Sequence, residues 1–100
     1  MPIRPRKPVV GRPKGSSTFD SPSAQAFGTV VRSARVRAGI SQEELAYLSE
    51  LDRSHFSKLE RGLSQPTLFA ILKIARALGY KASTLVAMTQ RILSGDSASE

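Results

Sequence analysis

The sequence contains no cysteine and a single histidine, His55, and these two shortages exclude most metal and redox chemistry. Without cysteine the chain has neither a disulfide framework nor a thiolate metal site, and one histidine cannot form a metal cluster by itself. A glycine-rich phosphate loop followed by Lys and Ser or Thr is also missing. We therefore expect no metal, no cofactor and no enzyme activity, since 100 residues leave little room for a catalytic cleft beside a helical bundle.

Long hydrophobic runs are equally scarce. The first fifteen residues contain four prolines, and their longest apolar run is Val9-Val10. A secretory signal or a membrane-spanning helix needs a far longer apolar stretch. We expect neither, and we place the protein in the cytoplasm, because the lack of cysteine fits a reducing compartment.

No segment alternates between apolar and polar residues with period two, so no β-strand is expected. Apolar residues instead recur at helical spacing, as they do from Phe27 to Ala34. This spacing predicts an all-α fold of five short helices in one domain at residues 23–93. Residues 1–22 have too few apolar groups to become ordered and are predicted to be a flexible arm. Residues 94–100 are predicted to be a polar tail.

Positive charge is abundant, with 15 Lys and Arg against 8 Asp and Glu and a net charge of +7. Residues 1–22 hold five basic residues and one acid, and residues 23–91 hold ten basic residues and five acids. Arm and domain are thus both basic. A positive field of this kind attracts nucleic acid, so double-stranded DNA is the expected partner.

The segment from Ser41 to Gly62 predicts two short helices joined by a tight turn. Ser41 followed by Glu44 is typical of a capping box, and Asp52 can cap a second helix that Gly62 ends. This spacing suits a helix-turn-helix, in which the N-terminal end of the second helix enters a major groove. Other helical hairpins can show the same spacing, so the pattern alone leaves them open.

Beyond this spacing, the sequence resembles the lambda-repressor-like (XRE, Cro/repressor) helix-turn-helix family over residues 24–92. The resemblance rests on Gly39-Ile40-Ser41-Gln42-Glu43-Glu44-Leu45-Ala46 and Leu59-Glu60-Arg61-Gly62, with Phe27-Gly28, Pro66-Thr67 and Ala77-Leu78-Gly79 around them. One position departs from the family, since Glu50 stands where the turn usually has glycine and must tolerate left-handed backbone or an altered turn. The resemblance implies a five-helix lambda-repressor-like domain and a dimeric transcriptional regulator that recognises specific DNA sequences.

The resemblance also implies a role for individual polar residues. The base-reading positions are Arg53, Ser54 and Ser57, and His55 between them is predicted to contact a base edge or a phosphate. The phosphate-binding positions are Gln42, Lys58 and Arg61. Arg53 suits guanine, whose O6 and N7 accept two parallel hydrogen bonds from a guanidinium. Arg35 and Glu60 occupy the positions of a structural ion pair in the family, which would be costly to break from one side.

Residues 11–15 of the arm, Gly-Arg-Pro-Lys-Gly, weakly resemble the core of an AT-hook. An extended arm can place a guanidinium in a narrow A·T minor groove, where the potential is most negative. Arg12 and Lys14 are therefore predicted minor-groove contacts. A full hook has another arginine before the glycine, where this chain has Val10, so non-specific phosphate attraction and a passive tail stay open as alternatives.

A dimer is expected because one reading helix covers only a few base pairs, and two related by a two-fold axis read half-sites about 34 Å apart. The predicted interface lies on the C-terminal helix, at Val86, Met88, Ile92 and Leu93. Three kinds of regulator fit these features. They are a stand-alone repressor or activator, a controller protein of a restriction-modification system, and an antitoxin that binds a toxin partner and represses its own operon.

Overall fold

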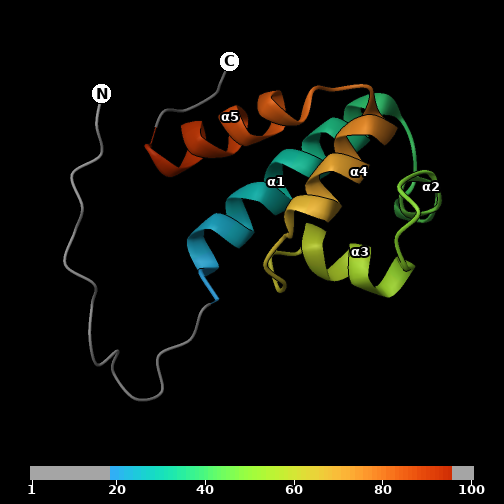
Figure 1. Ribbon diagram of the computed structural model, residues 1–100, viewed down its shortest axis with the longest axis horizontal. Coiled ribbons are helices and arrows are strands. Elements are labelled where there is room, and N and C mark those ends of the chain that lie inside the picture. Colours follow the sequence, from blue (N-terminus) through green and yellow to red (C-terminus); the bar gives the residue numbers. More distant parts are fainter. Residues whose placement is uncertain (1–18, 96–100) are drawn as a thin grey trace.

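A computed structural model describes residues 19–95 of the chain, and within them all the regular structure is helical (Figure 1). The five helices are α1 (Ser21–Ala38), α2 (Gln42–Leu48), α3 (Arg53–Glu60), α4 (Leu68–Leu78) and α5 (Ala82–Leu93). The predicted all-α fold and its five helices are confirmed for this part of the chain. Most of the predicted arm and most of the predicted tail lie outside the described residues.

Side-chain caps explain where most of these helices begin. The side chains of Asp20, Ser41, Asp52 and Thr67 each accept a hydrogen bond from a backbone N–H in the first turn of the helix that follows. Only half of the predicted capping box forms, because Ser41 accepts from the Glu44 N–H while no hydrogen bond returns from the Ser41 N–H to the Glu44 carboxylate. α5 begins at Ala82, and its N-cap residue Lys81 forms no side-chain cap hydrogen bond.

One hydrophobic core joins the five helices. α1 runs through the bundle, with α5 lying along it and α2 and α3 packed at one end (Figure 1). The largest fully buried side chains come from five different helices and are Phe56, Leu45, Leu59, Ile74, Leu85 and Val31. Because α3 contributes two of these side chains, its position is fixed by the core and not by the loops at its ends.

α1 and α3 approach each other most closely at Gly28. A Cβ atom added to Gly28 would lie 2.5 Å from the Glu60 carbonyl oxygen and 2.8 Å from the Leu59 carbonyl oxygen. No side chain larger than hydrogen fits there without moving the backbone. The close crossing brings the α1 side chain of Arg35 within reach of Glu60 at the C-terminal end of α3.

The turn between α2 and α3 contains the unusual residue Glu50. Its φ of 59° lies in the left-handed region, which is the first of the two outcomes expected where the family usually has glycine. The Glu50 carboxylate forms an ion pair with Lys73 of α4. This ion pair attaches the turn to α4. The attachment occurs at the residue whose backbone has a conformation that non-glycine residues seldom adopt.

Candidate nucleic-acid interface

The inner side of α3 is almost completely buried. Phe56 and Leu59 are 0% and 1% exposed, and Glu60 is 7% exposed. These three residues recur at the spacing of one helix face. Since they anchor the helix, the remaining side chains of α3 must point away from the core.

The outer side of α3 carries the predicted DNA contacts. Arg53, Ser54 and Lys58 are exposed, and His55 and Ser57 are half-buried. Arg61, which follows the last residue of α3, is also exposed. Neither His55 nor any of the three predicted base-reading residues lies inside the bundle, so all four are accessible to a ligand approaching the first turns of the helix.

Asp52 organises the N-terminal end of this outer side. One carboxylate oxygen accepts from the backbone N–H of Ser54 at 3.1 Å and from that of His55 at 3.3 Å, and from the Ser54 hydroxyl at 2.9 Å. The side-chain hydrogen bond from Ser54 and these backbone bonds hold the pKa of Asp52 below its ordinary value. The carboxylate is therefore ionised at neutral pH, and the Ser54 hydroxyl hydrogen is committed to it.

A hollow of about 580 Å³ lies between the first turns of α2 and α3. Its lining consists of Glu43, Asp52, Arg53, Ser54 and Ser57. Glu43 was not among the predicted site residues, although its place beside Gln42 at the start of α2 pointed to this surface. Two carboxylates beside Arg53 limit how closely a phosphate can approach here, which favours contact of Arg53 with base edges over contact with the DNA backbone.

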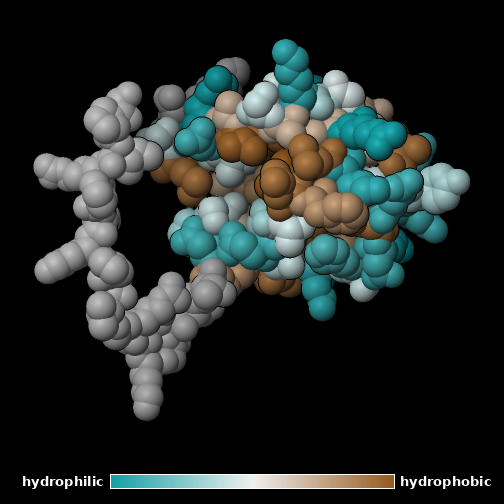
Figure 2. All heavy atoms as spheres, in the orientation of Figure 1, coloured by the Kyte–Doolittle hydropathy of each residue, from teal (hydrophilic) through white to brown (hydrophobic). Residues whose placement is uncertain are grey.

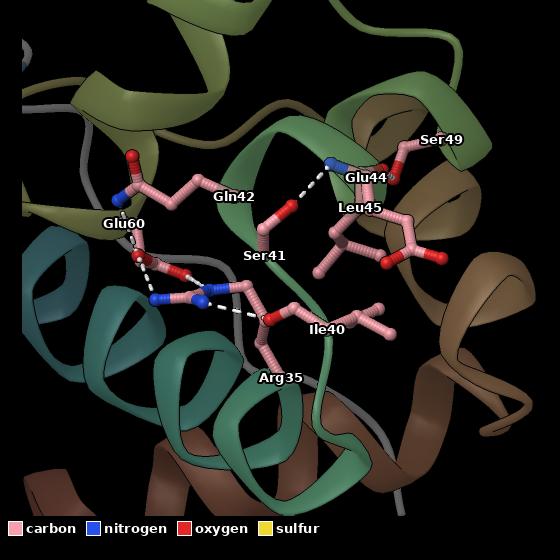
Figure 3. A network of polar contacts seen from close by, with 8 residues as sticks. All are labelled: Arg35, Ile40, Ser41, Gln42, Glu44, Leu45, Ser49 and Glu60. Carbon is pink, nitrogen blue, oxygen red and sulfur yellow. Dashed lines mark hydrogen bonds and ion pairs between the residues drawn. The ribbon is translucent and has the colours of Figure 1, made fainter.

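A buried polar network ties α1, α2 and α3 together behind this surface (Figure 3). Arg35 donates from Nε to Glu60 Oε2 at 2.6 Å, from Nη2 to Glu60 Oε1 at 3.1 Å and from Nη1 to the Ile40 carbonyl at 2.9 Å. The side chains of Arg35 and Glu60 are 14% and 2% exposed. Such a two-pronged pair is strong and directional, and it fixes the angle between α1 and α3.

Gln42 belongs to this network as well as to the surface. Its Nε2 donates to Glu60 Oε1 at 2.6 Å, so one of its two amide hydrogens is used inside the protein. The second hydrogen stays available for the predicted phosphate contact. The bond to Glu60 was not predicted from the sequence, and it makes Gln42 a link between the outer surface and the ion pair.

The start of α1 lies beside the loop that follows α3. Gln65 accepts from the Asp20 backbone N–H and donates to the Ser23 hydroxyl at 2.9 Å. The predicted minor-groove residues Arg12 and Lys14 lie outside the described residues. The start of α1 nonetheless lies close to the C-terminal end of α3, where the predicted phosphate contact Arg61 is found.

The predicted dimer residues do not share one face of α5. Met88 packs against the core and lines a hollow between α5 and α1 together with Ile92. Val86 and Leu93, seven residues apart, lie on another flank and are 41% and 47% exposed.

More exposed apolar area comes from α4. The helical spacing puts Leu68 and Leu72 next to buried Ala75, yet they are 70% and 51% exposed, and Phe69 is 62% exposed. Figure 2 shows apolar side chains gathered over α4 and α5. We call Leu68, Phe69, Leu72, Val86 and Leu93 the apolar face.

Other kinds of site can be checked in the described part of the chain. Residues 19–95 bring no three His, Asp or Glu side chains together in the way that a metal site requires. None of the five helices there combines the length and hydropathy needed for a membrane crossing.

Comparison with known proteins settles the family. A helix-turn-helix domain family matches residues 26–87, which span most of α1, all of α2, α3 and α4, and the first half of α5. The chain belongs to the helix-turn-helix domain family. Because such domains bind DNA through the second helix of the motif, the protein is a DNA-binding transcriptional regulator.

The relatives of this helix-turn-helix protein include restriction-modification controllers. The control protein C.BamHI of Bacillus amyloliquefaciens is 39% identical over 64 residues, which cover 63% of this chain and 79% of the relative. The controller protein C.AhdI from Aeromonas hydrophila, known from its crystal structure, is 44% identical in sequence and has a TM-score of 0.60 to this fold. The match covers 62% of this chain and 94% of that chain. The controller protein C.Esp1396I, solved as a tetramer with its natural 35-base-pair operator, is 28% identical, with a TM-score of 0.63 and 69% and 91% of the two chains covered.

Proposed function

We propose that this regulator binds its operator as a dimer and places the first turns of α3 in the major groove. The observation that carries the proposal is the arrangement of α3, whose Phe56 and Leu59 are buried while Arg53 and Lys58 are exposed on the opposite side. Arg53 donates two parallel hydrogen bonds to a guanine, a contact that provides about 1–3 kcal/mol of discrimination. Lys58, Arg61 and the free amide hydrogen of Gln42 bind phosphates.

Ser54 has a restricted role in this arrangement. Its hydroxyl hydrogen is donated to Asp52, so only the lone pairs of its oxygen are free. An acceptor suits the exocyclic amino group of cytosine or adenine and does not suit guanine O6 or N7. Ser57 and His55 carry no such restriction and contact base edges or adjoining phosphates.

The apolar face is the interface between the two subunits. It consists of residues of α4 and α5, so a partner bound there leaves the outer side of α3 uncovered. A contiguous exposed apolar surface is costly in a monomer and is typical of a contact between identical chains. The predicted interface on α5 is therefore kept for Val86 and Leu93 and extended to α4, whereas Met88 and Ile92 line the hollow between α5 and α1 and are left out of it.

The similarity to three controller proteins favours a role in timing the expression of restriction-modification genes. It supports this role over that of an antitoxin, because all three relatives are similar over most of their own length. The protein acts as a non-enzymatic cytoplasmic regulator, and the genes beside its own identify the system that it controls.

Selection of bound sequences from a random duplex library, followed by binding to the selected site, tests the proposal. Arg53→Ala should lose the preference for the selected site while retaining weak, salt-sensitive binding to arbitrary duplexes. The control Lys58→Ala should weaken binding to selected and arbitrary duplexes by similar factors. Undiminished site preference in Arg53→Ala would refute the assigned reading.

A further inference from the structure

A second surface, separate from the outer side of α3, has the features of a protein-binding groove. One hollow of about 770 Å³ follows α1 beside the C-terminal end of α3, and another of about 340 Å³ lies between α1 and α5. Both are lined by Thr29, Ser33 and Arg37, so they form one groove that crosses α1. We call it the α1 groove.

The α1 groove has a concentration of unpaired positive charge. Its lining includes four arginines, Arg32, Arg37, Arg61 and Arg91. No ion pair within residues 19–95 involves any of their side chains. The single carboxylate in the lining belongs to Glu60, which is already held by Arg35 and Gln42. The groove therefore lacks the anions that would neutralise it.

Apolar groups accompany these arginines. Val36 is 60% exposed and Ile92 is 37% exposed, and both line the groove. A phosphate backbone gains nothing from contact with such side chains, whereas an amphipathic peptide buries its own apolar residues against them. A second copy of this chain fits poorly, because the described residues carry ten Lys and Arg against six Asp and Glu.

We propose that the α1 groove binds an acidic amphipathic segment of another protein. Carboxylates of the segment pair with Arg32, Arg37 and Arg91, while Arg61 keeps its phosphate contact, and the apolar residues of the segment contact Val36 and Ile92. The groove reaches α3 only at its C-terminal end, at Glu60 and Arg61, so a partner seated between α1 and α5 can be held while the outer side of α3 is on DNA. This inference is independent of the base-reading roles assigned above.

Fluorescence anisotropy with a synthetic peptide tests the proposal. The probe is a helical peptide with glutamates on one face and leucines on the adjoining face, and its control has serines in place of the leucines. The leucine peptide should bind with a measurable Kd, and the serine peptide should bind at least several-fold more weakly. Absence of binding by the leucine peptide, or equal binding of both peptides, would overturn the proposal.

Matched variants locate the binding site. Arg91→Glu should weaken peptide binding by roughly tenfold, since it replaces a pairing charge with a repelling one, while Lys81→Glu outside the lining should change it little. Ile92→Ser should likewise weaken binding more than Leu63→Ser, an exposed leucine that lies outside both the lining and the apolar face.

Binding to a random-sequence duplex by the same variants distinguishes a protein groove from a DNA surface. Arg91→Glu and Lys81→Glu change the net charge equally, so both should lower the affinity for the duplex by the same small factor. A much larger loss of duplex affinity in Arg91→Glu would show that the groove holds phosphates, and the proposal would fail. Circular dichroism confirms that each variant is folded.

Discussion

The two sides of α3 are held in opposite ways, although they alternate along only eight residues. On the inner side, Glu60 accepts three hydrogen bonds from Arg35 and Gln42 and is 2% exposed at its side chain. On the outer side, Arg53 and Lys58 form no ion pair with any residue between 19 and 95. One charged group is completely satisfied inside the protein, and the others are left for a ligand.

This difference separates folding from recognition. Changes on the inner side should alter the stability of the bundle and affect DNA binding only through unfolding. Changes on the outer side should alter DNA binding without a measurable loss of stability, because exposed substitutions away from caps and cores have small effects. The following experiments test how complete this separation is.

Glu60→Ala should produce the largest effect on stability. The Arg35 side chain is only 14% exposed, and the substitution leaves its guanidinium without a carboxylate partner. A stranded buried charge typically costs about 3 kcal/mol, which urea unfolding followed by circular dichroism can measure. Site preference of the fraction that stays folded should be unchanged. Altered preference at full folding would show that the inner side also takes part in recognition.

The ion pair between Lys73 and Glu50 provides the control. Glu50 is 69% exposed at its side chain, so solvent screens its interaction with Lys73. Lys73→Ala should therefore destabilise the protein far less than Glu60→Ala. Equal losses would mean that burial does not explain the importance of the Arg35–Glu60 pair.

Leu72→Glu should have the next largest effect, on assembly and not on folding. Leu72 is 51% exposed on the apolar face, so a carboxylate there costs little in the monomer but is buried in the proposed dimer. We expect the dimer to be weakened by about 2 kcal/mol, roughly thirtyfold in Kd, with a parallel loss of operator binding. Sedimentation velocity measures the change, and Val36→Glu on α1, 60% exposed, is the control. A dimer unaffected by Leu72→Glu would place the interface elsewhere.

Much of this architecture could be predicted from the sequence because the signals are local. Ser41 and Asp52 mark helix starts through hydrogen bonds to residues two or three positions away, and glycine at position 39 marks a helix end. The Arg35–Glu60 contact required the family resemblance, since nothing local relates positions 25 residues apart.

The features that the sequence did not reveal depend on packing between helices. The bond from Gln42 to Glu60 joins α2 to α3 and depends on how these two helices pack against each other. Leu68 and Leu72 continue the apolar spacing of α4, yet they are 70% and 51% exposed. The predicted interface residues do not all lie on one face of α5, because Met88 packs against the core and lines a hollow between α5 and α1.

Deletion of residues 1–18 should have a moderate effect on DNA binding and none on the fold. The deletion removes five basic residues and keeps the Asp20 cap of α1. Affinity should fall, and the slope of log K against log salt should decrease by about 0.9 for each phosphate that the arm neutralises in the full-length protein. Titrations at several salt concentrations measure this slope. An unchanged slope would make the arm a passive tail.

Arg12→Ala with Lys14→Ala distinguishes the two modes of binding that the arm could use. If Arg12 enters a minor groove, the double variant should lose more affinity for an operator with A·T flanks than for one with G·C flanks. Equal losses on both flanks would indicate non-specific phosphate attraction.

The smallest effect should come from lowering the pH until Asp52, the N-cap residue of α3, becomes protonated. Its pKa is lowered in the folded protein by the side-chain hydrogen bond from Ser54 and the backbone N–H of His55, so folding favours the ionised form. The resulting stabilisation is fully present above the unfolded-state pKa, about 3.9, and is lost as the pH falls through the lower folded-state value. Asp52→Asn keeps the cap but cannot titrate there. The difference in unfolding midpoint between the wild type and Asp52→Asn should therefore stay constant from pH 8 to about pH 5 and change only below about pH 4, where the carboxylate is protonated. A difference that already varies near neutral pH would mean that Asp52 is not held ionised and that the Ser54 hydroxyl is free to donate to a base.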